Sequence, residues 1–227
     1  MGVQETIRNR PRWVWVACLI CACLAPAQQA PSERESIPTF GTTVVVSSGL
    51  RGDIYFIPVD TVRLPDFKHL KSVGAIYTTN LNVPPGNFQQ GFPGITSRYE
   101  WFAIDYTGRF WIEQPGRYRF GLTSDDGSKL YLDSRLVIDN DGVHESSGCT
   151  ANVDLARGIH SLRVSYFQGP RFQVSLILGV ARPGAPWRIF DTRDFTPPSN
   201  SDAWTSNDAG QPKKQNGKVR RGNCWAQ

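Results

Sequence analysis

The stretch that decides the fold is Tyr118-Arg-Phe-Gly-Leu-Thr-Ser-Asp-Asp-Gly-Ser-Lys-Leu-Tyr-Leu-Asp133. Large apolar residues alternate with small or charged ones on both sides of a polar break at 124–128. A period of two residues is typical of a strand with one buried face and one solvated face. Because Gly127 tolerates a positive φ and aspartates favour turns, the break predicts a hairpin loop between two strands.

Two adjacent carboxylates, those of Asp125 and Asp126, lie within this predicted loop. Neighbouring carboxylates repel each other unless a cation or several N–H donors face them. Hard cations such as Ca²⁺ prefer clustered oxygen ligands. The pair is therefore either part of a solvated turn or a calcium site, and the spacing leaves both interpretations open.

Short alternating segments recur along the chain, and none has a sustained helical period. Strands are predicted at 52–57, 101–106, 110–112, 118–123, 130–133, 135–138, 152–155, 160–167 and 172–180. Turns are expected at Thr107-Gly108 and Asp133-Ser134, and residues 59–97 are expected to be loop-rich. Many short strands between Gly and Pro turns predict an all-β fold, a two-sheet antiparallel β-sandwich.

Several motifs occur in an order that is typical of one known family. They are Pro115-Gly116, Tyr118-Arg-Phe120, Ser124-Asp-Asp-Gly-Ser128, Leu130-Tyr-Leu-Asp133, Val137-Ile-Asp-Asn140, Leu155-Ala-Arg-Gly158 and Val164-Ser-Tyr-Phe167. Over roughly residues 50–185 the chain resembles the PA-fourteen domain, which is named after the N-terminal fragment of anthrax protective antigen. The resemblance implies the same β-sandwich for these residues.

The resemblance also implies a ligand site. Fungal adhesins of this family hold Ca²⁺ with an Asp-Asp pair joined by a cis peptide bond, and the metal then binds sugar hydroxyls. By position, that pair is Asp125 and Asp126 here. Those lectins add an Asn from the loop between the last two long strands, where this chain has Gln168-Gly-Pro-Arg171. The third ligand is then missing or replaced by a backbone carbonyl or by Gln168, and Gln168 or Arg171 would touch the sugar.

The N-terminus has the three parts of a secretory signal peptide. Basic residues precede an apolar run from Trp13 to Leu24, and Ala25-Pro-Ala27 offers a cleavage site. The run is shorter than the span of about 20 residues that a membrane helix needs. Ile20-Cys-Ala-Cys23 also resembles a loose lipobox in which Cys23 would be acylated. Both interpretations predict export, with the chain either secreted or periplasmic, or bound to the envelope membrane through a lipid anchor alone.

The expected organisation is a signal peptide at 1–27, a linker at 28–48, the sandwich at 49–196 and a disordered basic tail at 197–227. The tail is rich in polar residues and cannot bury enough apolar surface to fold alone. Cys149 and Cys224 both lie beyond the cleavage site. In an oxidising compartment they would form a disulfide between the tail and the loop after Asp141, and the alternative is two free thiols.

The net charge of +5 comes from the two ends of the chain. Residues 31–196 hold 17 basic and 17 acidic residues, so the predicted domain is neutral. The high isoelectric point is therefore no argument for nucleic-acid binding, and we expect no nucleic-acid partner.

Catalytic motifs are absent from the sequence, including Gly-x-Ser-x-Gly, His-Glu-x-x-His and a phosphate loop. The carboxylates of a glycosidase face each other about 5–9 Å apart across a cleft, whereas Asp125 and Asp126 are adjacent. The missing motifs predict a non-catalytic module, and the resemblance implies that the module binds a glycan, with Ca²⁺ as its cofactor. The alternative is a cell-surface structural or protein-interaction domain in which the Asp pair only shapes a turn.

Overall fold

The computed structural model describes residues 49–87, 92–95, 98–170, 173–199 and 223–226. The predicted signal peptide with Cys23, the linker at 28–48, Arg171 and most of the predicted tail lie outside the described residues. Within the described part, no helix has the length and apolar character that a membrane crossing requires.

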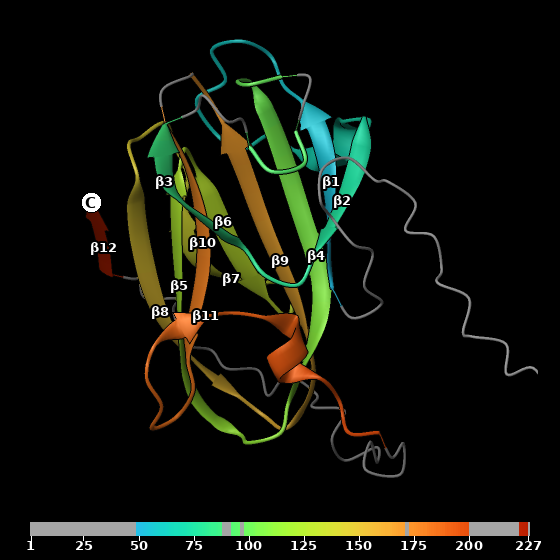
Figure 1. The fold of residues 1–227 in the computed structure, drawn as a ribbon, viewed down its shortest axis with the longest axis vertical. Helices are drawn as coiled ribbons and strands as arrows, with labels where there is room; N and C mark the ends of the chain where they lie inside the picture. The colour runs from blue at the N-terminus through green and yellow to red at the C-terminus, as the bar shows by residue number, and fades with distance from the viewer. Residues whose placement is uncertain (1–48, 88–91, 96–97, 171–172, 200–222, 227) are drawn as a thin grey trace, which may run out of the picture. The chain divides into compact units, whose positions relative to one another are not determined.

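Two antiparallel sheets pack face to face, which confirms the predicted β-sandwich (Figure 1). The first sheet has the order β2 (Gly74–Thr78), β1 (Leu50–Phe56), β4 (Phe102–Ile112), β9 (Gly158–Gln168), β6 (Ser128–Leu132) and β7 (Arg135–Asn140). The second has the order β11 (Arg188–Ile189), β10 (Gln173–Ala181), β5 (Gly116–Asp125), β8 (Ser147–Leu155) and β12 (Asn223–Ala226), with β3 (Asn82–Asn87) also paired to β10. Two short 3-10 helices, η1 (Phe67–His69) and η3 (Thr192–Phe195), complete the described elements.

The core lies between the sheets and follows the predicted alternation. Phe120 and Leu122 of β5 and Leu176 and Leu178 of β10 are fully buried, as is Tyr166 of β9. Neighbouring residues on these strands point to the outer faces, because successive side chains of a strand alternate. The packed core therefore fixes the strand ends from which the loops emerge.

The predicted turn at Thr107-Gly108 is wrong, because β4 runs unbroken through both residues. A Cβ atom at Gly108 would lie 2.6 Å from Cδ2 of Leu50, which is fully buried. Glycine inside a strand often marks such a close approach. Gly108 is therefore explained by close packing against β1 and not by a turn.

The segment predicted to be loop-rich, 59–97, contains two strands, β2 and β3. The sequence of β3 includes Pro84-Pro85, and proline is tolerated in edge strands because it has no N–H to donate. β3 pairs only with β10, and the register shifts between Val174 and Leu176. The two prolines therefore led to the prediction of a loop where the structure has an irregular edge strand.

Candidate functional site

The Asp125-Asp126 pair lies where the chain crosses from one sheet to the other. Asp125 ends β5, which pairs with β8 and β10, whereas β6 pairs with β7 and β9. The predicted hairpin between β5 and β6 is therefore wrong. The peptide bond between Asp125 and Asp126 is cis.

Gly127 follows the pair and is needed for space. A Cβ atom at this position would lie 2.7 Å from the backbone nitrogen of Gly142. Gly127 is not among the glycines with positive φ, in contrast to the expectation from the sequence. The crossing therefore passes directly against the loop between β7 and β8.

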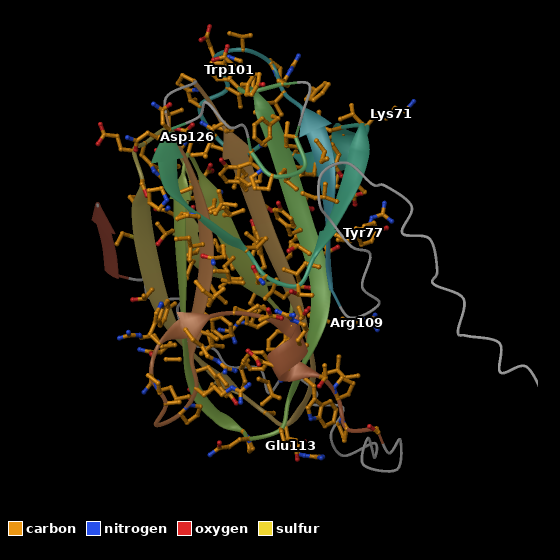
Figure 2. All side chains as sticks on the ribbon, in the orientation of Figure 1. Lys71, Tyr77, Trp101, Arg109, Glu113 and Asp126 are labelled. Atoms are coloured by element: carbon orange, nitrogen blue, oxygen red, sulfur yellow. A yellow bond between two sulfur atoms is a disulfide. The ribbon has the colours of Figure 1, made fainter. Side chains whose placement is uncertain are left out.

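Two loops border the Asp pair at this end of the sandwich, where Figure 2 labels Asp126. One follows β7 and joins β8, whose first residue, Ser147, lies opposite Ser124 of β5. The other follows β9 and joins β10, whose Ser175 lies opposite Asp125. The pairing of β5 with both strands thus places the two loops beside the carboxylates.

The carboxylate of Asp126 is buried and held by three N–H groups. The backbone nitrogen of Gly169 donates to Oδ2 at 2.7 Å, and that of His144 donates to Oδ1 at 3.1 Å. Nε2 of Gln168 donates to Oδ2 at 3.3 Å. A carboxylate has about four lone-pair positions, so Asp126 keeps one for a further partner.

Gln168, a predicted sugar contact, is fully buried. Besides Asp126, its Nε2 donates to the carbonyl oxygens of Pro170 and Gln173, at 3.3 and 3.2 Å. Its Oε1 lies 2.6 Å from the hydroxyl of Tyr166. Gln168 therefore positions Asp126 and the β9–β10 loop and does not present its amide to solvent.

The electrostatics of the pair are unfavourable without a cation. Burial, followed by the charge of Asp126, raises the pKa of Asp125 to about 7, and Glu145 adds to the rise. His144 and the backbone N–H of Ser146 offset it only in part. Burial also raises the pKa of Asp126, against the N–H groups of Gly169 and His144. Burial and the neighbouring charge therefore disfavour the ionised form of Asp125 when no cation is bound.

The fit of a calcium ion depends on oxygen donors. The pair supplies two carboxylates, which are hard ligands of the kind that Ca²⁺ prefers. Across the described ranges, no third His, Cys, Asp or Glu side chain joins the pair in a metal-ligand cluster. Since Ca²⁺ takes six to eight oxygens, backbone carbonyls, water and ligand hydroxyls would have to complete its shell. Buried like charges and spare oxygen lone pairs fit such an ion.

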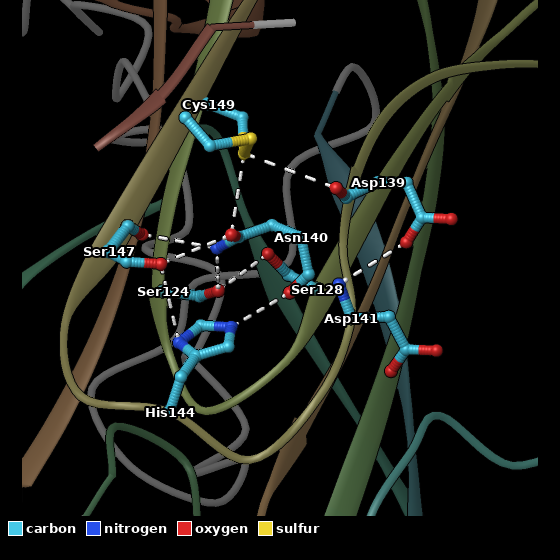
Figure 3. The surroundings of a disulfide bond; sticks show 9 residues. Ser124, Ser128, Asp139, Asn140, Asp141, His144, Ser147 and Cys149 are labelled. Carbon is cyan, nitrogen blue, oxygen red and sulfur yellow. Dashed lines mark hydrogen bonds between the residues drawn. A yellow bond between two sulfur atoms is a disulfide. The ribbon is translucent and has the colours of Figure 1, made fainter. Parts of the chain in front are cut away.

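A polar network supports the β7–β8 loop (Figure 3). Nδ2 of Asn140 donates to Oγ of Ser124 at 3.0 Å and to the carbonyl oxygen of Ser147 at 3.1 Å. The hydroxyls of Ser124 and Ser128 lie 2.6 Å apart. Nε2 of His144 lies 2.9 Å from the carbonyl oxygen of Asn140. The network thereby fixes the loop that gives Asp126 its His144 N–H.

Cys149 is joined to Cys224 by a disulfide. Cys149 lies in β8 and not in the loop after Asp141, where the sequence analysis placed it. The two cysteines are cross-strand neighbours of β8 and β12. The residues Asn223–Ala226 belong to the segment expected to be a disordered tail, and the structure shows a strand there.

Comparisons with known proteins agree on the fold. The family model of the PA14 domain, the PA-fourteen domain of the sequence analysis, matches residues 79–216. No protein with a curated description matches the sequence.

Three similar solved structures share the fold at low sequence identity. The PA14 domain of the MpAFP antifreeze protein has a TM-score of 0.53 and 18% sequence identity. The match covers 69% of this chain and 94% of that one. The PA14 sugar-binding domain from an RTX adhesin has a TM-score of 0.52 and 18% sequence identity. The match covers 65% of this chain and 97% of that one. An anti-sigma factor domain-containing protein has a TM-score of 0.52 and 20% sequence identity. The match covers 67% of this chain and 49% of that protein, so this chain spans about half the length of that protein.

Proposed function

This chain belongs to the PA14 domain family, and we propose that it is a non-catalytic carbohydrate-binding module whose ligand is held at the Asp125-Asp126 pair. The observation that carries the proposal is the burial of two adjacent carboxylates at a loop end, where burial raises the pKa of both and the charge of Asp126 raises that of Asp125 further. Such an arrangement is costly unless a cation neutralises it. A related structure described as a sugar-binding domain adds support.

In this proposal Asp125 and Asp126 hold a Ca²⁺ ion. When bound, the ion supplies a positive centre that attracts the vicinal hydroxyls of a sugar. Asp126 is oriented by the N–H groups of Gly169, His144 and Gln168, which leave one lone-pair position for the metal. The carboxylate of Asp125 accepts from the backbone N–H of Ser146 and keeps more of its capacity.

The bordering loops would choose the sugar. Gln168 is buried beneath the pair and positions Asp126, so it contributes to the affinity for the ligand without touching it. Arg171 follows in the same β9–β10 loop and remains the proposed sugar contact. In this proposal the predicted signal peptide directs the module out of the cytoplasm, so that it is secreted, periplasmic or held in the envelope through Cys23.

The proposal is tested by calorimetric titration of Ca²⁺ into the full mature chain, followed by a glycan array with and without EDTA. The Asp125→Asn variant removes one charge while retaining the shape of the side chain and all three N–H bonds to Asp126. We expect calcium binding and EDTA-sensitive glycan binding in the wild type and neither in Asp125→Asn. The matched control is Asp139→Asn, which removes an exposed carboxylate from strand β7 of the other sheet.

The alternative function is a cell-surface structural or protein-interaction domain. It is favoured by the hydrogen bonds that already occupy three positions of Asp126 and by the burial of Gln168. Under this alternative, millimolar Ca²⁺ produces no heat and EDTA changes no interaction of the chain. That result would remove the calcium mechanism and leave the pair as a structural crossing.

A further inference from the structure

A concave surface lies on the outer face of the first sheet. It is a groove of about 460 Å³. The side chains that give it chemical character are those of Thr107, Arg109, Tyr131, Ser134, Ser161 and Arg163. None of these residues belongs to the Asp125-Asp126 site.

The strand register explains why these side chains share one face. Thr107 of β4 lies opposite Arg163 of β9, and Arg109 lies opposite Ser161. Tyr131 of β6 lies opposite Arg163 from the other side. Because β4, β9 and β6 are neighbours, five of these side chains form adjacent rows on one surface, and Ser134 lines the groove from the β6–β7 turn. The small side chains of Thr107, Ser134 and Ser161 leave room for a groove beside Arg109, Arg163 and Tyr131.

Arg163 is fixed in place as one wall of the groove. Its Nε lies 2.8 Å from Oδ1 and 3.0 Å from Oδ2 of Asp105. Its guanidinium carbon lies 5.3 Å from the ring centroid of Tyr131 and 5.7 Å from that of Phe67. A wall held in this way loses little conformational entropy when a ligand binds.

Arg109 carries the uncompensated charge of the groove. Its side chain is exposed, and no hydrogen bond or ion pair engages it among the residues that the structure describes. The charge of Arg163 is balanced by Asp105. An anion that enters the groove would therefore meet the guanidinium of Arg109, which pairs with carboxylate or sulfate oxygens through two parallel N–H bonds.

We propose that this groove is a second ligand site that binds an acidic saccharide unit, with Arg109 on its carboxylate or sulfate group. The hydroxyls of Thr107, Ser134 and Ser161 then face the hydroxyls of the sugar, and the ring of Tyr131 flanks it. The shared chemistry is an anionic group on a polyhydroxylated ring, as in a uronic acid or a sulfated sugar.

The groove and the Asp pair are too far apart to share one sugar unit. Ser161 lies near the start of β9 and Gln168 at its end, roughly 23 Å away at about 3.3 Å per residue. Figure 2 accordingly shows Arg109 lower on the sandwich than Asp126. Binding in the groove is therefore independent of calcium, and the inference stands without the proposed function.

The test is calorimetric titration of the full mature chain in EDTA and low salt with three trisaccharides: one of uronic acid, one sulfated and one neutral. We expect at least one acidic trisaccharide to bind, and its affinity to fall at least tenfold in Arg109→Gln. Comparison of the two acidic ligands identifies which anion the groove takes. The matched control is Arg117→Gln, which removes an exposed arginine from β5 in the other sheet.

Three results would overturn the inference. They are no binding of either acidic ligand up to millimolar concentration, equal binding of the neutral trisaccharide, and an equal loss in Arg117→Gln, which would indicate a general charge effect. Retention of acidic-saccharide binding by Asp125→Asn supports a site separate from the Asp pair, whereas its loss would contradict that separation. Because Arg109 is exposed, Arg109→Gln is expected to fold, and its thermal unfolding confirms this before titration.

Discussion

Nδ1 of His160 lies 2.6 Å from Oδ2 of Asp133, and Nε2 of the same ring lies 2.9 Å from the carbonyl oxygen of Ala156. Both nitrogens face acceptors, so only the protonated imidazole satisfies both. Burial opposes the charge, but the hydrogen bonds to Asp133 and Ala156 outweigh it and raise the pKa of His160. Burial likewise opposes the charge of Asp133, whose pKa is nevertheless lowered by His160 and Ser161.

These shifts predict a pH-dependent contribution to stability. A raised histidine pKa stabilises the fold fully below the ordinary value of about 6.5, and the contribution is lost as pH rises through the folded value. The lowered pKa of Asp133 contributes above about pH 4 and is lost as pH falls through the folded value. The pair therefore stabilises most between these limits.

His160→Gln is expected to lower the free energy of unfolding by about 1.5–3 kcal/mol at pH 5.5, the range of hydrogen bonds to charged groups. The loss should be smaller at pH 8.5, where the wild-type histidine is less charged. Urea unfolding at both pH values measures the difference. His69→Gln, at an 83% exposed side chain, is the control and should show no such dependence. An equal loss at both pH values would contradict the prediction.

The alternation of apolar and polar residues predicted the buried strands well, because it depends only on which face of a strand each side chain occupies. β5 and β10 were located by their alternating apolar residues, as was the inner face of β9. The glycines were misassigned because their cause is tertiary: Gly108 makes room for Leu50, and Gly127 makes room for Gly142. A sequence gives the residue type at these positions but not the chain segment that will pass against it.

The position of the candidate site was predictable from the sequence, but the hydrogen bonds that hold its carboxylates were not. The Asp pair was identified from its neighbours in sequence, whereas the N–H of His144 reaches Asp126 only because β8 pairs with β5. One signal for Gln168 was present and missed. Leu162, Val164 and Tyr166 alternate on the inner face of β9, and Gln168 continues that row into the core.

Loss of the disulfide should destabilise the chain. The bond between Cys149 and Cys224 closes a loop of 75 residues, and cross-links of this kind typically contribute about 2–4 kcal/mol. Cys224→Ser is the suitable change because Cys149 is fully buried and its replacement would also alter the core. We expect the denaturation midpoint of Cys224→Ser to fall and to match that of the reduced wild type. Equal midpoints for oxidised and reduced wild type would contradict this.

Ser134→Gly should stabilise the chain. Asp133 and Ser134 connect β6 to β7 with φ values of 48° and 63°, the left-handed region that the Asp-Gly turn prefers. The left-handed conformation costs a residue with a side chain about 1–2 kcal/mol in the folded state. Glycine avoids this cost but loses about 0.5–1 kcal/mol more in backbone entropy on folding. The expected net gain is about 0.5–1 kcal/mol in urea unfolding. Ser161→Gly, in the extended strand β9, should instead lose stability, and a loss at Ser134 would show that its hydroxyl matters more than its backbone.

Tyr166→Phe should weaken calcium binding without touching a carboxylate. The Tyr166 hydroxyl lies 2.7 Å from the carbonyl oxygen of Asp125 and 2.6 Å from Oε1 of Gln168. The single proton of this hydroxyl is shared between the two buried acceptors, so its removal takes one donor from them, at a cost of about 1–3 kcal/mol. It also frees Gln168, which holds Asp126. We therefore expect a lower free energy of unfolding together with a weaker calcium affinity by calorimetry.

The control for Tyr166→Phe is Tyr118→Phe, which removes a hydroxyl of the same kind. The Tyr118 hydroxyl donates to the carbonyl oxygen of Gln114 at 2.8 Å, beyond the opposite end of β5 from Asp125. This variant should lose stability and keep the wild-type calcium affinity. Since both variants lose one hydroxyl, a difference confined to calcium affinity identifies Tyr166 as a positioning residue of the Asp pair. Equal calcium affinity in both would mean that the Tyr166 hydroxyl serves the core alone.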